Sequence, residues 1–492
     1  MNHESGQNKF GILICRQLWI NGGRALCSFI LAVVLTVGSI VRADLIDDTV
    51  GALMQKSHLP GLSLAVVQDG KIVKAAGYGV RSKGSPSPVT DKTLFQAGTL
   101  SQAITALGAL ALVESGKVSL DADTNETLKT WRLPGNELTE SSKVTLRELL
   151  NHTAGLTVPV FQGYAADAAV PSLGQILEGE KPANSKPIRV EAIPGAKWHY
   201  SSGGYAIVQR LITDVTNEPF QDFISANVLR PLGMTASNYE QPLSAGSAGN
   251  AATGHVQLLP LADRWYLYPE LAATGLWTTP SDLARFSIAI QQAFVGSGNA
   301  TVTTDMAHEM LAAGKNNFGL GFALSGLGSM ARFSGMGRSA GFFATTSFFL
   351  TTAQGAVVMV NNDADIGTTS ILMATIACAY DWPDYRAMKS TLSLDDRDIR
   401  MTELLKNIFA AAQHGKLNRS IFTTAVANEF TGRISDELQK MQTWGNYVSL
   451  TSIGWNNNLT APEYCYILKY ERKTLVTTCA FDQKGKIAAL DY

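Results

Sequence analysis

The chain is poor in charged side chains. Asp, Glu, Lys and Arg make up 16% of its 492 residues, against roughly 25% in an average soluble domain. The 40 basic and 41 acidic residues nearly cancel, so the formal net charge is −1. A protein that binds nucleic acid or another polyanion gathers Lys and Arg in blocks or patches, and this sequence has no such block. We therefore expect no nucleic-acid partner.

Cysteines are also few. The sequence has five of them, with no C-x-x-C pair and no Cys/His cluster of metal-site spacing, so we expect neither a metal nor a cofactor. Cys465 and Cys479 flank a short charged turn, and reflection about Arg472 places them opposite each other on paired strands. In an exported protein such a pair forms a disulfide or stays as two buried thiols. The sequence leaves both alternatives open.

Apolar residues, by contrast, are abundant at 46% of the chain, enough for a large core. Residues 25–41 carry no charge and lie between Arg24 and Arg42, and Val41-Arg42-Ala43 resembles a signal-peptidase cleavage site. We predict that residues 1–43 are a signal peptide, with an uncleaved membrane anchor as the alternative. The protein is then exported, periplasmic or extracellular, and contacts a membrane only through this segment if it is uncleaved.

Periodicity divides the rest of the chain. Residues 100–114 are apolar nearly all round and predict a helix buried in the middle of a domain. A single helix is expected over 204–226, and paired antiparallel strands over 341–363. The segment around Pro383 is polar and has no apolar period. We predict one domain over 44–385, a linker at 386–396 and a C-terminal α+β module, helical first and then all strand, over 397–492.

Several stretches in a fixed order carry a family resemblance. The buried helix opens on FQAGTLSQ (95–102), and further framework stretches lie downstream: VTLRELLNHTAGL (144–156), PG and WHYSSGGY (194–205), PLGM (231–234), GLW with DLA (275–284) and FGLG (318–321). Together they resemble the penicillin-binding-protein and class C β-lactamase family of serine hydrolases, including its esterase and D-aminopeptidase members.

The resemblance implies a fold as well as a chemistry. The implied fold is α+β, an antiparallel sheet flanked by helices plus a mostly helical lobe. The C-terminal part resembles the small NTF2-like modules appended to some exported members. The implied chemistry is hydrolysis of amides or esters through an acyl-enzyme, for which the family uses three motifs: S-x-x-K, Y-x-N or Y-x-S, and K-T-G or H-x-G.

The first motif has changed at both of its key positions. Thr99 stands where the family has its nucleophilic serine, and Gln102 stands where it has lysine. Threonine keeps the hydroxyl but adds a methyl that restricts χ1. Glutamine forms hydrogen bonds but carries no charge, so it cannot take the proton from the nucleophile. Thr99 is also a good helix N-cap, and we favour this structural role for it.

The second motif, Tyr200-Ser201-Ser202, is intact, whereas the third reads Gly335-Met336-Gly337 and has lost its basic residue. Arg338 is the nearest remaining cation, and we expect it to be solvated. We predict Thr99 and Tyr200 as catalytic residues. The predicted substrate-binding residues are Gln102, Ser202, Gly335 and Gly337, although the two glycines also suit the backbone of a strand edge.

Two histidines near the motifs are less promising as substitute bases. The resemblance puts His152 in a framework helix–turn. His199 precedes Tyr200, and consecutive side chains of an extended segment point to opposite faces. Two functions therefore remain open. The protein is an exported acyl hydrolase of weak or no activity, or a non-catalytic protein that holds a small-molecule ligand, a peptide or a cell-wall fragment in its cleft.

Overall fold

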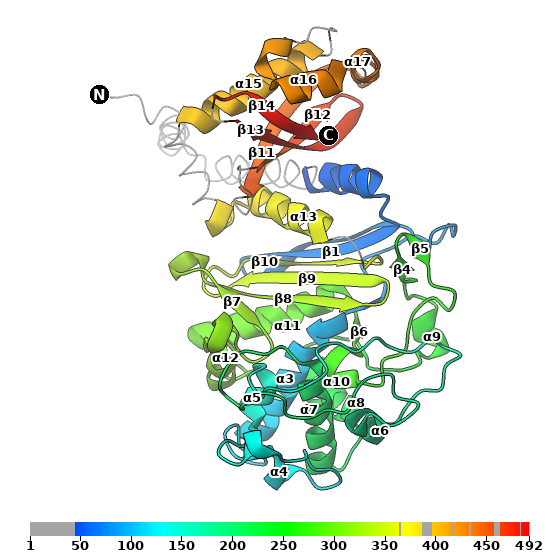
Figure 1. Ribbon diagram of the computed structural model, residues 1–492, viewed down its shortest axis with the longest axis vertical. Coiled ribbons are helices and arrows are strands. Elements are labelled where there is room, and N and C mark those ends of the chain that lie inside the picture. Colours follow the sequence, from blue (N-terminus) through cyan, green and yellow to red (C-terminus); the bar gives the residue numbers. More distant parts are fainter. Residues whose placement is uncertain are drawn as a thin grey trace, which may run out of the picture.

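The computed structural model (Figure 1) describes residues 45–491, apart from short gaps at 364–365, 386–395, 413, 415–417, 432–433, 457–462 and 483. The predicted leader at 1–43 lies outside the described residues, as does all of the predicted linker except Asp396. No helix in the described ranges is long and apolar enough to cross a membrane.

The centre of the main domain is a six-stranded antiparallel sheet with the strand order β2-β1-β10-β9-β8-β7. Its strands are β1 (Gly61–Gln68), β2 (Lys71–Gly79), β7 (Ala323–Ser325), β8 (Arg332–Ser339), β9 (Phe342–Phe349) and β10 (Gly355–Val360). The short edge strand β7 pairs only with the first part of β8, from Arg332 to Ser334. The rest of that strand can therefore meet the helical lobe.

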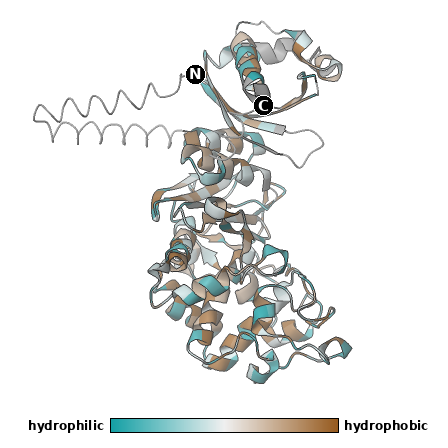
Figure 2. Ribbon diagram, turned by 90° about the vertical axis from the view of Figure 1, so that its left-hand side faces the viewer, coloured by the Kyte–Doolittle hydropathy of each residue, from teal (hydrophilic) through white to brown (hydrophobic). Residues whose placement is uncertain are grey.

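A helical lobe covers one face of the sheet and extends away from it (Figure 1). Its helices are α3 (Ser101–Glu114), α4 (Thr124–Thr127), α5 (Leu146–Leu150), α6 (Leu173–Glu178), α7 (Ser202–Thr216), α8 (Phe220–Ile224), α9 (Ala245–Ala248), α10 (Leu271–Thr274), α11 (Pro280–Gln292) and α12 (Thr304–Met310). Figure 2 shows apolar residues running through the helices of this lobe, with hydrophilic residues mostly at its periphery.

Helix α3 forms the axis of the lobe, and the prediction of a buried helix is confirmed. Eleven of its 14 residues are buried, because apolar side chains surround the helix and neighbouring helices cover it on every side. Gly116, with φ +70°, ends the helix in a left-handed turn in which the Lys117 N–H donates to the Leu112 carbonyl. The start of α3 consequently opens inside the domain, against the sheet.

The opposite face of the sheet carries a helix over residues 45–57, helix α13 (Ile366–Ala379) and the C-terminal module. The module contains helices α15 (Asp396–Ala412), α16 (Thr424–Thr431) and α17 (Ile434–Thr443), followed by the antiparallel strands β11 (Tyr447–Asn456), β12 (Glu463–Tyr470), β13 (Lys473–Phe481) and β14 (Ile487–Asp491). Ile453, Ile467 and Val476 from one face of its sheet join the core that includes Leu372 and Ile376 of α13. The α+β fold and the helix-then-sheet order of the module are confirmed.

Two local predictions are wrong. The helix expected over 204–226 is two helices, because Asn217 takes a left-handed conformation (φ +58°) and Pro219 follows it. Cys465 and Cys479 do not lie opposite each other: Cys465 pairs with Thr478, and Cys479 with Tyr464.

The cysteine error comes from the hairpin turn. A two-residue turn at Glu471-Arg472 pairs Tyr470 with Lys473, which shifts the register by one residue from the expected one. A shift of one residue moves a side chain to the other face of the sheet. Cys465 accordingly packs against the core beside α13, Cys479 lies in the interior of the module, and no disulfide joins them.

Candidate active site

Thr99 lies in a single 3₁₀ turn, η1 (Gly98–Leu100), between the short strand β3 (Phe95–Gln96) and α3. Gly98 has a φ of +57°, and a Cβ on it would lie 2.5 Å from the main-chain nitrogen of Arg338. The turn is therefore pressed directly against β8. The Thr99 hydroxyl donates a hydrogen bond to the Met336 carbonyl of that strand, with the oxygens 3.0 Å apart.

This contact corrects the predicted cap. The N-cap position of α3 is Leu100, and no side chain caps the helix. The helix continues directly from the preceding 3₁₀ turn, and the carbonyl groups of Gly98 and Thr99 in that turn accept the N–H of Ser101. Thr99 therefore lies outside the cap position. The hydroxyl instead faces strand β8 of the sheet.

Gln102 is the second residue of α3, about one turn after Thr99, and is 3% exposed. Its side-chain amide donates to the Tyr200 hydroxyl at 3.0 Å and to the Ser202 hydroxyl at 3.4 Å. Three of the residues predicted from sequence, from segments 98 to 100 residues apart, thus form one hydrogen-bonded group. The group at its centre is a neutral amide, which can hold the two hydroxyls in place but cannot accept their protons.

Tyr200 rests on the ring of His152, with the two ring centroids 4.2 Å apart. The Ser201 N–H donates to His152 Nδ1 at 3.4 Å, so the proton of the neutral ring sits on Nε2. Burial lowers the pKa of His152 to about 3, and the ring is neutral at physiological pH. His152 therefore packs and orients the tyrosine segment, in keeping with its predicted framework role.

His199 faces away from this group. Its Nε2 lies 3.0 Å from Glu191 Oε1, while its main-chain N–H donates to the His152 carbonyl at 2.7 Å. The extended segment thus alternates as expected, with the histidine on one side and Tyr200 on the other. Neither histidine contacts Thr99.

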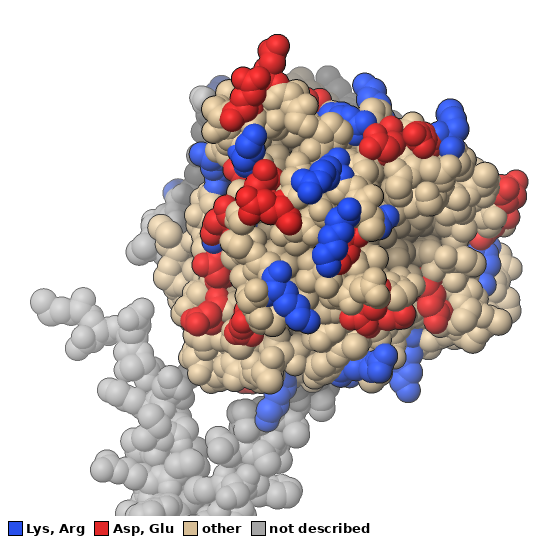
Figure 3. Space-filling view, turned by 90° about the horizontal axis from the view of Figure 1, so that it is seen from below, with Lys and Arg blue, Asp and Glu red and all other residues tan. Residues whose placement is uncertain are grey.

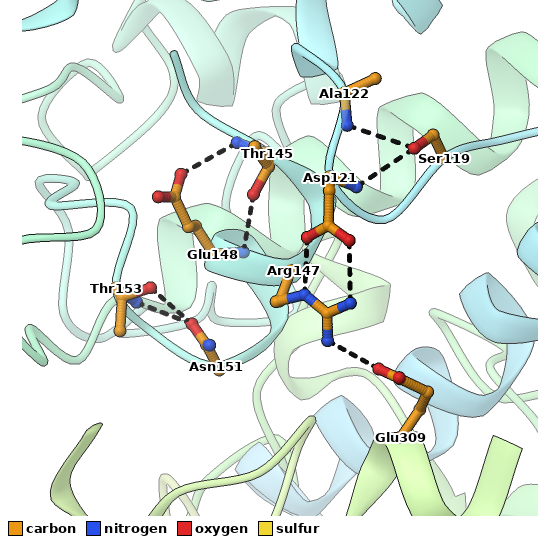
Figure 4. Close-up of polar contacts among 9 residues, drawn as sticks. All are labelled: Ser119, Asp121, Ala122, Thr145, Arg147, Glu148, Asn151, Thr153 and Glu309. Carbon is orange, nitrogen blue, oxygen red and sulfur yellow. Dashed lines mark hydrogen bonds and ion pairs between the residues drawn. The ribbon is translucent and has the colours of Figure 1, made fainter. Parts of the chain in front are cut away.

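Helix α5, whose capping contacts are drawn in Figure 4, leads directly into the turn that contains His152. Helix α5 begins with a capping box: the Glu148 N–H donates to the Thr145 side chain, and the Glu148 carboxylate accepts from the Thr145 N–H. It ends at Asn151, whose side-chain oxygen accepts hydrogen bonds from the N–H and the hydroxyl of Thr153. Between them His152 takes a left-handed conformation, φ +60°. Caps at both ends fix the turn that supports Tyr200.

An ion-pair junction anchors the same helix to the rest of the lobe. Arg147 makes two parallel contacts with Asp121, of 2.6 and 2.9 Å, and a third with Glu309 on α12 at 2.6 Å (Figure 4). A guanidinium suits this bidentate geometry. The junction ties together three chain segments that are distant in sequence.

Gly335 and Gly337 lie on β8 and face the start of α3. A Cβ on Gly337 would lie 1.8 Å from the Ala97 carbonyl oxygen, and one on Gly335 would lie 2.6 Å from the Leu100 side chain. Both glycines therefore serve the close approach of β8 to η1. This approach is what brings the Met336 carbonyl to Thr99.

One carboxyl group near the site was not anticipated. Glu270 precedes α10 and is fully buried, and in the described part of the chain neither of its oxygens has a partner from another side chain or segment. Burial raises its pKa to about 8. The sequence signal was available, since Glu270 is the one charged residue in the otherwise apolar run from Tyr266 to Trp277. The Met336 carbonyl had no such signal, because a main-chain acceptor leaves no trace in residue identity.

On the face of the molecule seen from below, charges of one sign do not gather in a large patch (Figure 3). Figure 3 shows acidic and basic side chains interspersed over the face of the molecule seen from below. Within the ranges that the structure describes, no group of three or more His, Cys, Asp or Glu side chains is arranged to hold a metal ion.

Comparison with known proteins agrees with the fold of the main domain. The β-lactamase family model matches residues 46–374. The chain belongs to the β-lactamase family. It is 23% identical to protein flp of Staphylococcus aureus (strain N315) over 236 residues, 48% of this chain and 45% of that relative. It is 27% identical to a β-lactamase of Pseudomonas fluorescens over 279 residues, 53% of this chain and 71% of the relative. The matched region thus spans less than half the length of flp.

Solved structures give the same family fold. An octameric penicillin-binding protein homologue from Pyrococcus abyssi superposes with a TM-score of 0.54 at 17% identity, covering 90% of this chain and 94% of that one. A β-lactamase/D-alanine carboxypeptidase from Yersinia pestis, solved with citrate, gives 0.56 at 16% identity, covering 69% and 99%. At these identities the likeness concerns the fold.

Proposed function

We propose that this β-lactamase-family protein is exported and that its cleft at Thr99, Gln102, Tyr200 and Ser202 binds an amide or ester ligand, which it hydrolyses slowly or not at all. One observation carries the proposal: the group that joins Tyr200 to Ser202 is the neutral amide of Gln102. Acyl transfer by a hydroxyl needs a base or a cation at this place, and glutamine is neither.

The chain's own groups can still bind such a ligand. The hydroxyls of Tyr200 and Ser202, which Gln102 holds in place, can donate hydrogen bonds to a ligand carbonyl oxygen or accept them from a ligand amide. Thr99 supplies the hydroxyl for attack, but its proton is directed to the Met336 carbonyl, and an amide carbonyl does not accept a proton at neutral pH. The geometry supports binding better than turnover.

The expected loss of rate is large. Removing a single oxyanion donor costs about 2.7–4 kcal/mol of transition-state stabilisation. Replacing the family's lysine by glutamine and its third-motif base by glycine removes two charged groups. We expect a combined cost of at least that order, so ordinary β-lactamase activity should be marginal or absent.

The first test is to incubate the purified chain with a chromogenic cephalosporin and with an activated ester, and to measure turnover and intact mass. We expect little or no colour change and no added acyl mass. Fast turnover, or acylation mapped to Thr99, would overturn the proposal. Thr99→Val is the matched control, since it keeps the shape of the side chain and removes the hydroxyl.

A second test restores the first motif. We expect the double variant Thr99→Ser/Gln102→Lys to gain acylation by the same ester, because the lysine would lie between the Tyr200 and Ser202 hydroxyls that now bind the amide. The matched control, Thr99→Ser/Gln102→Met, keeps the new hydroxyl without the charge and should stay unacylated. If a stably folded double variant shows no acylation, the site has lost more than these two groups.

The non-catalytic alternative, a peptide or cell-wall-fragment binder, is favoured by the hydrogen bond that engages the Thr99 proton with the strand. N-acetyl-D-alanyl-D-alanine is a suitable probe, since the similar Yersinia protein is a D-alanine carboxypeptidase. A pure binder should keep its affinity for this dipeptide in Thr99→Val and lose it in Tyr200→Phe. A dipeptide that is cleaved by the natural chain and spared by Thr99→Val would instead indicate slow hydrolysis.

Export is proposed from the leader. The test is to express the full chain in a secreting bacterial host and determine the N-terminus of the product in each cell fraction. Soluble exported protein that begins after Ala43 would support a cleaved signal peptide. Intact protein in the membrane fraction would support an anchor, and protein retained intact in the cytoplasm would contradict export.

A further inference from the structure

A cavity lies on the face of the sheet opposite Thr99, with a volume of about 420 Å³. Its floor is formed by outward-facing side chains of β8 and β9, and one wall by α13. Side chains of β9 alternate across the sheet: Phe342 and Phe348 belong to the core of the helical lobe, whereas Phe343 belongs to the core beneath α13. Thr345 and Ser347 therefore face the cavity.

Hydroxyl groups dominate the polar part of this cavity. Ser334, Thr345 and Ser347 line its floor, and in the described part of the chain their side chains make no hydrogen bond. Thr369 and Ser370 add two hydroxyls from the α13 wall. A hydroxyl both donates and accepts, so this lining matches a ligand that itself carries several hydroxyl groups.

The cavity contributes no net charge. Its two ionisable residues, Arg332 and Asp384, form an ion pair of 2.5 Å at one end, and Arg332 also donates to Ser325 at 3.2 Å. A charged ligand would have to be desolvated without a free opposite charge to receive it, which is unfavourable. The ligand that fits is uncharged.

The remaining lining of the cavity is mostly apolar. Met336, 65% exposed, lies on the floor, and Met373, Ala374 and Ala377 line the wall beside the ring of Trp382. A purely aliphatic ligand would cover the floor hydroxyls and deprive them of water, which costs free energy. A sugar ring has both a hydroxyl rim and an apolar C–H face, and so matches floor and wall together.

We propose that this cavity is a binding site for an uncharged carbohydrate of one or two sugar units. The volume lies within the range of about 300–1,000 Å³ that is usual for small-molecule sites. The site lies across the sheet from the Thr99 cleft and uses none of its side chains. It is therefore independent of whether the protein hydrolyses anything.

The experiment is a titration of the full chain with cellobiose and with N,N′-diacetylchitobiose, followed by calorimetry and by ligand-detected NMR. We expect saturable binding of at least one of the two sugars. Thr345→Val should weaken it about three- to tenfold, the effect of one neutral hydrogen bond. Ala374→Phe should abolish it by filling the cavity from the α13 wall.

Two controls keep the result specific. Thr213→Val makes the same change at a half-buried hydroxyl on α7, away from the cavity, and should leave binding unchanged. Tyr200→Phe should also leave it unchanged, since Tyr200 belongs to the proposed cleft and does not line this cavity. The proposal is overturned if neither sugar binds saturably, or if binding survives intact in both Thr345→Val and Ala374→Phe while these variants melt at the temperature of the natural chain.

Discussion

Among single residues, Glu270 has the most unusual environment. A fully buried carboxyl without a cationic partner is expensive to ionise, and burial raises its pKa to about 8. The folded protein therefore holds a proton at Glu270 at neutral pH, while the unfolded chain has released it. This difference must appear in the pH dependence of stability.

We predict that Glu270→Gln flattens part of that dependence. Between about pH 4.3, the ordinary value of a glutamate, and pH 8, the folded state binds more protons than the unfolded state. The natural chain should thus lose free energy of unfolding as the pH rises through this window, by an amount on the order of a few kcal/mol in total. Urea unfolding of both proteins from pH 5 to 8 measures it, and parallel profiles would show that Glu270 is not protonated in the fold.

The two glycines of β8, Gly335 and Gly337, can be compared by the same substitution to alanine. We predict that Gly337→Ala destabilises the protein by about 2–3 kcal/mol, because its Cβ would meet the main-chain oxygen of Ala97, which cannot move alone. Gly335→Ala should cost about 1 kcal/mol, since it meets only the flexible end of Leu100. Thermal and urea unfolding compare the two, and equal costs would contradict the close approach at Ala97.

At the scale of elements, helix α5 depends on its junction as well as on its caps. We predict that Arg147→Ala lowers the free energy of unfolding by about 1 kcal/mol at low salt, and by less at high salt, because the three charged side chains are partly exposed. Arg147→Lys should recover only part of the loss, since an ammonium group cannot form the parallel pair with Asp121. A loss that is independent of salt and identical in both variants would assign the effect to packing.

The helices and strands that were predicted correctly have clear signals in the sequence. Helix α3 and the strands β9 and β10 were predictable, because each has a strong apolar pattern of its own. The break at Asn217 was missed, although Pro219 marks it, because the apolar pattern continues past it. The predicted pairing of the two cysteines was wrong by one residue, because the hairpin turn has two residues and not three. The charged residues at the turn are compatible with either turn length.

Those parts of the site that have a sequence motif were predictable, and those that depend on the main chain were not. Thr99, Gln102, Tyr200 and Ser202 could be chosen from motifs, and three of them share hydrogen bonds in the fold. The acceptor of the Thr99 proton could not, because it is a main-chain carbonyl 237 residues away. The structural role of Gly337 likewise depends on which backbone lies opposite it.

At the scale of the whole molecule, the C-terminal module completes the core above the sheet. Ile467 faces that shared core, whereas its neighbour Leu468 faces the interior of the module, and both are at most 2% exposed. We predict that Ile467→Ala lowers the stability of the main domain and the module together by about 2–5 kcal/mol, in a single calorimetric transition. Leu468→Ala is the control, because it destabilises the interior core of the module without removing a side chain from the shared core. Two separate transitions, with that of the main domain unmoved by Ile467→Ala, would show that the module is only appended.

Strand β8 gives the molecule one further property. Met336 presents its carbonyl to Thr99 and its side chain to the cavity beside α13. A ligand that binds at one of these two sites and moves Met336 changes the binding free energy of a ligand at the other site. Thermodynamic linkage makes the two changes equal. If the dipeptide and the sugar both bind as proposed, each should therefore alter the affinity of the other by the same factor, through the thickness of a single strand.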